Sequence, residues 1–93
     1  MGHRRETYLV EQYRPGLEPG ELERLASRVR VAVNRLERDG KPIRFLRSTI
    51  VPADEAVLSI VEAVSEELVR EAYARAGSPI ERISAAIDQG GRP

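Results

Sequence analysis

The chain of 93 residues contains no cysteine and no tryptophan, and its single histidine is His3. The absence of cysteine excludes disulfides, thiol catalysis and Cys/His zinc sites. No serine has a histidine to activate it, so a hydrolase triad cannot be built. One Phe and three Tyr leave the hydrophobic core to aliphatic side chains. These absences exclude most kinds of catalytic and metal site that a sequence can reveal. The predicted fold is therefore the main source of information about function.

The sequence also lacks net charge, because fifteen basic residues balance fifteen acidic ones. It therefore has no field that would attract nucleic acid or an anionic membrane, and we expect neither as a partner. No stretch reaches the roughly 18 apolar residues of a membrane span, and the first seven residues do not resemble a signal peptide. We therefore expect a cytoplasmic location.

The charges are nevertheless unevenly distributed along the chain. Residues 1–47 carry eleven basic and seven acidic groups, a net +4, whereas residues 48–93 carry four basic and eight acidic groups, a net −4. Two halves of opposite charge favour self-association of the chain. The alternative is that these charges simply lie on a solvated surface and have no functional role.

Strand and helix signals alternate along the first half. A β-branched and aromatic run over 7–13 predicts a strand that ends at the turn Arg14-Pro15-Gly16. Apolar residues then recur at three- and four-residue intervals, which predicts an amphipathic helix with Pro19 in its first turn and Gly40 at its end. Its buried stripe comprises Leu22, Leu25, Ala26, Val29, Ala32, Val33 and Leu36.

The second half predicts two strands, a helix and a last strand. Runs over 43–51 and 56–63 are joined by so short a turn, 52–55, that they should pair as a hairpin. Ser65 is the predicted N-cap of a second helix, which Gly77 ends. A short strand over 83–87 follows. We expect one domain over residues 1–93, with an ordered core over 7–88 and flexible termini.

The order βαββαβ predicts an α+β fold of the ferredoxin-like type. A four-stranded antiparallel sheet in the order 4-1-3-2 would carry both helices on one face. We place Val10, Leu46, Ile50, Val57 and Val61 under the helices. The opposite face would then present Leu9, Glu11, Tyr13, Phe45, Arg47, Thr49, Leu58, Ile60 and Glu62.

A chain this small cannot easily leave an apolar sheet face in water. We therefore expect a second copy of the chain to cover it, which gives a homodimer of the dimeric α+β barrel type or a larger closed assembly.

The candidate ligand-binding residues are Glu11, Tyr13, Arg47 and Glu62. Because the first and third strands are neighbours, Glu11 and Glu62 could come near each other, with Arg47 one strand away. Such groups over an apolar floor resemble a small-molecule pocket, in which Arg47 would bind a carboxylate or phosphate. The alternative is that the charged residues stand at the sheet ends in water or pair across a dimer interface.

Two functions fit this face. The first is a non-catalytic ligand-binding or interaction protein that acts as a dimer and uses no cofactor. The second, by fold analogy, is a cofactor-independent isomerase, cyclase or monooxygenase of small organic substrates. There Glu11 or Glu62 would be the base, and Tyr13 or Arg47 would stabilise an enolate-like oxygen. No catalytic residue is assigned.

Several short segments together resemble a family of small bacterial proteins of unknown function, whose best-known branch is nickel-binding and nickel-responsive. They are the segments 8–16, 44–49, 54–55, 62–63 and 75–79, within a resemblance that covers 7–87. The resemblance implies a ferredoxin-like fold and dimerisation through the sheets, and it implies no agreed activity.

The nickel property does not follow from the resemblance. Positions that are histidines in the metal-binding branch match Glu11, Tyr73 and Ser78 here, and cysteines that relatives place in the third strand match Val57 and Ser59. Without imidazole or thiolate ligands we expect no nickel or zinc site. Glu11 and Glu62 would hold at most a hard, oxygen-preferring cation, and weakly.

Overall fold

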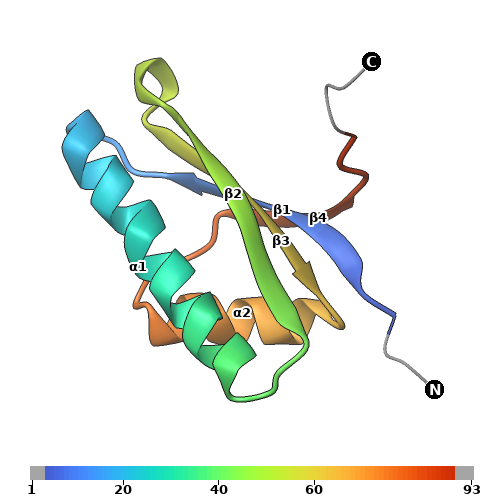
Figure 1. The fold of residues 1–93 in the computed structure, drawn as a ribbon. Helices are drawn as coiled ribbons and strands as arrows, with labels where there is room; N and C mark the ends of the chain where they lie inside the picture. The colour runs from blue at the N-terminus through green and yellow to red at the C-terminus, as the bar shows by residue number, and fades with distance from the viewer. Residues whose placement is uncertain (1–3, 90–93) are drawn as a thin grey trace.

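The computed structural model describes residues 4–89, and its elements follow the order βαββαβ (Figure 1). They are β1 (Glu6–Tyr13), α1 (Pro19–Arg38), β2 (Ile43–Val51), the short 3-10 helix η1 (Pro52–Asp54), β3 (Ala56–Ala63), α2 (Glu66–Arg75) and β4 (Arg82–Ala86). The four strands form one antiparallel sheet in the order β2-β3-β1-β4. The predicted ferredoxin-like α+β fold is confirmed. The predicted flexible ends lie mostly outside the described residues.

Helix α1 begins and ends where its local chemistry requires. The Glu21 side chain accepts a hydrogen bond from the Glu18 backbone N–H at 3.0 Å, which satisfies a donor that the first turn leaves free. Beyond the helix, Gly40 adopts φ of 89°, a left-handed conformation that glycine takes without steric cost. All seven residues of the predicted stripe are buried.

Helix α2 is shorter, and its N-cap is the predicted one. The Ser65 hydroxyl accepts a hydrogen bond from the Leu68 backbone N–H at 3.2 Å. Two ion pairs with i,i+4 spacing, Arg70 with Glu66 and Arg75 with Glu71, lie on its exposed surface. Its buried side is formed by Leu68, Val69, Ala72 and Tyr73.

The molecule has two layers, with both helices against one face of the sheet (Figure 1). The main hydrophobic cluster joins α1 and α2 to the sheet, and a smaller one lies under the first half of α1. Within residues 4–89, neither helix is long and apolar enough to cross a membrane. Among residues 4–89, no helix or strand forms a second layer over the face of the sheet away from the helices.

Strand β2 departs from the predicted alternation. Phe45 pairs with Val61 and Arg47 pairs with Ile60, so the pairing register shifts between them and Leu46 is the extra residue of a β-bulge. Phe45 consequently packs against the main core, whereas Leu46 belongs to neither core cluster. The predicted placement of Leu46 under the helices and of Phe45 on the face away from them was wrong. One inserted residue changes the sheet face on which each residue before it in the strand lies.

Candidate functional site

The sheet face away from the helices, here called the open face, carries alternate residues of every strand. Its apolar centre consists of half-buried Leu9, Leu58 and Ile60, with Leu9 directly opposite Ile60 across the β1–β3 pair. Around that centre the register places Glu11, Tyr13, Arg44, Arg47, Thr49, Glu62, Arg82 and Ser84. All four sequence-predicted site residues therefore lie on this face.

Glu11 and Tyr13 form one polar cluster with Arg82. The Tyr13 hydroxyl donates a hydrogen bond to Glu11 Oε1 at 2.7 Å, and Arg82 Nε lies 3.7 Å from Glu11 Oε2. The Glu11 side chain is only 16% exposed between these neighbours. The hydrogen bond to the carboxylate raises the pKa of the Tyr13 hydroxyl, because ionisation would place two negative charges side by side. The cluster therefore combines a hydrogen-bond acceptor, the Glu11 carboxylate, with a phenol hydroxyl, that of Tyr13.

Glu62 stands at the other end of the face. In the β1–β3 register Glu11 is opposite Leu58, four residues along the strand from Glu62. At 3.2–3.4 Å per residue that offset is about 13 Å. Glu62 instead lies 4.0 Å from Arg5 and directly opposite Arg44. The expected approach of the two carboxylates was therefore wrong within one chain, since neighbouring strands do not bring residues at different levels together.

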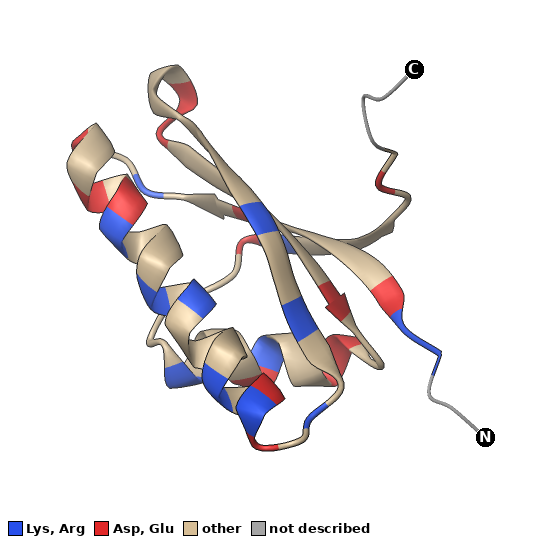
Figure 2. Ribbon diagram, in the orientation of Figure 1, with Lys and Arg blue, Asp and Glu red and all other residues tan. Residues whose placement is uncertain are grey.

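Arg47 is bound by a residue that follows the last strand. Its guanidinium forms an ion pair with Asp88. Because β2 and β4 are the two edges of the sheet, the segment after β4 must pass over the open face to reach Arg47. The side chain of Arg47 remains 54% exposed and that of Asp88 is 21% exposed. Arg47 belongs to β2 and Asp88 follows β4 in the chain. Figure 2 shows a basic position midway along β2 and an acidic position on the segment beyond β4.

A second polar cluster lies on the helix-covered side of the sheet. Gln12 Nε2 donates to Ser78 Oγ at 2.6 Å and to the Pro79 carbonyl at 2.9 Å. Three buried polar atoms have no hydrogen-bond partner in the part of the chain that the structure describes: Gln12 Oε1, Ser59 Oγ and the Tyr73 hydroxyl. Burial raises the pKa of Tyr73 to about 12.

Sequence reasoning missed three residues of these clusters. Arg82 lies opposite Glu11 on the neighbouring strand, and Asp88 reaches Arg47 from beyond the far edge of the sheet. Local sequence patterns mark neither pairing, because the partners come from segments far apart in the chain. Gln12 had a signal, because it shares the face of Tyr8 and Val10 in the alternation of β1. A polar residue on an otherwise apolar face predicts a buried hydrogen bond.

The fold and its open face define a class of protein: a ferredoxin-like α+β sandwich with helices on one side of its sheet. Residues 8–85 match the model of a family described as nickel-responsive protein, SCO4226-like, so the chain belongs to that family. The resemblance that the sequence motifs indicated is confirmed. A search of curated proteins found no match.

A solved structure supports the fold independently. The crystal structure of SCO4226 from Streptomyces coelicolor A3(2) superposes with a TM-score of 0.67, at 20% sequence identity, over 90% of this chain and 99% of that one. Identity at this level supports the fold and leaves the chemistry of the site to the residues present here.

Those residues do not fit nickel. Ser78 is hydrogen-bonded to Gln12, and Tyr73 lies in the core on the same, helix-covered side of the sheet. Glu11 is on the opposite face, so the three positions matched to family histidines do not converge. The cluster offers an amide, hydroxyls and a phenol that stays protonated at neutral pH, whereas imidazole and thiolate are the usual ligands of nickel and zinc. Within residues 4–89, no three His, Cys, Asp or Glu side chains are grouped to hold a metal ion.

Proposed function

We propose that the chain acts as a homodimer closed through the open face, and that the dimer holds a small organic anion between its two sheets. The observation that carries this proposal is the half-buried apolar centre of Leu9, Leu58 and Ile60 beside the exposed guanidinium of Arg47. Apolar surface in the middle of a sheet favours burial against a second sheet, and one unburied arginine beside it favours an anionic group.

Arg47 is the proposed anchor for the anion. Its planar fork matches a carboxylate or a phosphate with two parallel hydrogen bonds. In the structure this position is taken by Asp88, whose carboxylate is an anionic group of the same kind. Ligand binding therefore requires the acidic group of the ligand to displace Asp88 from Arg47, so the segment after β4 competes with the ligand.

The Glu11–Tyr13 pair is the proposed polar end of the same cavity. Its carboxylate already accepts a hydrogen bond from Tyr13 and faces Arg82, so it orients the phenol. We assign Tyr13, which is 41% exposed, the contact with a neutral oxygen of the ligand. Glu62, about 13 Å along the sheet, would contact a second, distant group or the second copy.

The proposal is tested by calorimetry after a thermal-shift panel of monocarboxylates, dicarboxylates and sugar phosphates. We expect Arg47→Ala to weaken any hit about tenfold, because a charge-assisted hydrogen bond contributes roughly 1.5–3 kcal/mol. Asp88→Asn should tighten the same hit severalfold by releasing Arg47. Arg44→Ala, which removes a charge from the same strand and face, serves as the control and should change the affinity less than about twofold.

Two results would contradict the proposal. Unchanged affinity in Arg47→Ala would remove the anchor. Equal losses in Arg47→Ala and Arg44→Ala would indicate general charge attraction rather than a site.

A further inference from the structure

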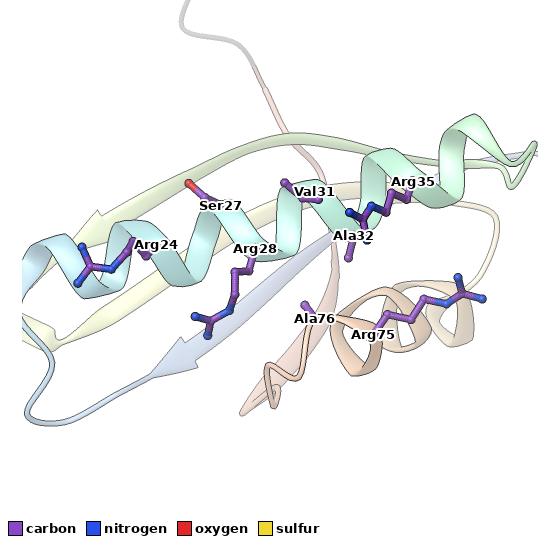
Figure 3. Close-up of a pocket in the computed structure, with 8 residues that line it drawn as sticks. All are labelled: Arg24, Ser27, Arg28, Val31, Ala32, Arg35, Arg75 and Ala76. Carbon is purple, nitrogen blue, oxygen red and sulfur yellow. The ribbon is translucent and has the colours of Figure 1, made fainter.

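A groove of about 570 Å³ lies between α1 and α2, in the layer away from the open face (Figure 3). Arg24, Arg28 and Arg35 border it from α1, and Arg75 borders it from the end of α2. Its floor is apolar and consists of Val31, Ala32 and Ala76. Val31 is 46% exposed, which is unusual for a large aliphatic side chain in this molecule.

The groove carries unbalanced positive charge. Among residues 4–89, no carboxylate lies within ion-pair distance of Arg24, Arg28 or Arg35, while Arg75 is paired with Glu71 at 2.7 Å. The acidic residues at the start of α1 are used elsewhere. Glu21 caps the helix, and Glu23 lines a separate pocket toward β2 together with Arg30.

The arginines form a row rather than a ring. Arg24, Arg28 and Arg35 are spaced by four and seven residues, so they follow one side of α1 over about 16 Å at 1.5 Å per residue. Figure 3 shows their side chains separated along the helix, with Val31 between Arg28 and Arg35. A single phosphate or carboxylate is too small to span the whole row. An elongated ligand with several acidic groups and an apolar strip can reach all.

We propose that this groove docks an acidic amphipathic helix from a partner protein. The apolar side of that helix would rest on Val31, Ala32 and Ala76, and its Asp or Glu side chains at intervals of three, four or seven residues would meet the arginine row. The arginine fork gives each such pair two parallel hydrogen bonds. The site does not depend on the open face, so it is available in a monomer or in a dimer joined through the sheets.

The test uses fluorescence polarisation with a labelled helical peptide of about 15 residues, which carries a leucine stripe flanked by glutamates. A second peptide has lysine in place of each glutamate. We expect the acidic peptide to bind and the basic one not to bind. Arg28→Gln/Arg35→Gln should weaken binding at least tenfold, because each lost charge-assisted hydrogen bond contributes roughly 1.5–3 kcal/mol.

The matched control is Arg30→Gln/Arg38→Gln, which removes the same charge from the same helix outside the groove. It should change the affinity by less than about twofold. A second variant, Val31→Glu, places an acid on the apolar floor and should weaken the acidic peptide as strongly as the double variant does.

Several outcomes would overturn the proposal. One is the absence of acidic-peptide binding at about millimolar concentration, the weak end of the affinity scale. Another is an equal loss in the two double variants. Displacement of the peptide by millimolar inorganic phosphate at constant ionic strength would indicate a small-anion site instead. A fall in sedimentation mass in Arg28→Gln/Arg35→Gln relative to the parent chain would assign the groove to a second copy.

Discussion

Tyr73 shows how one side chain can oppose the stability of the core that it fills. It is 1% exposed and lies in the main hydrophobic cluster, yet its hydroxyl has no hydrogen-bond partner among the described residues. Burial supplies favourable apolar contacts to the ring, while the hydroxyl loses its hydrogen bonds to water without full replacement. The same burial makes the phenolate unfavourable, which is why the pKa rises to about 12.

We expect Tyr73→Phe to raise the free energy of unfolding at neutral pH by about 1 kcal/mol, because it removes an unsatisfied buried hydroxyl and keeps the ring. The substitution should also change how the free energy of unfolding depends on pH in the alkaline range. The parent chain has a Tyr73 pKa of about 12 when folded and about 10 when unfolded, so it loses up to about 3 kcal/mol as pH rises through that window. Tyr73→Phe has no ionisable group at this position, so the variant should not lose this stability at alkaline pH. Urea unfolding at neutral pH and near pH 11 measures both effects.

Tyr13→Phe is the control for Tyr73→Phe, because it removes a hydroxyl from an exposed tyrosine. Its unfolding free energy at neutral pH should stay within about 0.5 kcal/mol of the parent value. A destabilised Tyr73→Phe variant would show that its hydroxyl has a partner in solution, in contradiction to the structure.

At the level of the elements, the bulge in β2 decides which residues meet the helices. Upstream of Leu46, Ile43 and Phe45 face α1 and α2, and downstream Ser48 and Ile50 do so. Without the extra residue, a strict period of two would place either Phe45 or Ile50 in the core, but not both. The bulge therefore lets one strand contribute apolar side chains to both core clusters.

The bulge predicts unequal costs for two adjacent truncations. Phe45→Ala should lower the free energy of unfolding by about 2 kcal/mol or more, because its ring packs on the main core. Leu46→Ala should cost less than about 1 kcal/mol, since it belongs to neither cluster. Chemical denaturation of both variants gives the comparison. The reverse ranking would mean that β2 pairs without the bulge.

For the whole molecule, the central question is what covers the open face. The helices bury one side of the sheet, and the segment after β4 reaches the other side through the ion pair between Asp88 and Arg47. A small two-layer chain gains stability when such a face is paired with another sheet. This is the physical basis of the proposed homodimer.

Ile60→Lys tests that assembly. It places a cation at the centre of the open face, directly opposite Arg47 across the β2–β3 pair, so closure would bring four like charges together. We expect the parent chain to sediment as a dimer at micromolar concentration and the variant as a 10.4 kDa monomer that retains its circular dichroism. Val31→Glu, a charge placed in the helix layer, should leave the dimer intact. A monomeric parent chain would contradict the proposal.

The sequence by itself determined the order of elements, the buried stripe of α1, the N-cap at Ser65 and the family. These follow from local periodicity, capping chemistry and short motifs, which act over a few residues. Placement of Glu11, Tyr13 and Glu62 on the open face also followed from alternation in regular strands.

Only the tertiary structure decided the sides of Phe45 and Leu46, the separation of Glu11 from Glu62, and the pairing of Arg47 with Asp88. The first depends on a bulge that no local pattern in β2 announces. The second depends on the register between β1 and β3, whose paired residues lie 43 or more positions apart in sequence. The third and the basic groove between α1 and α2 depend on how distant segments pack. Such contacts are set by the balance of burial and charge over the whole molecule, so sequence periodicity does not encode them locally.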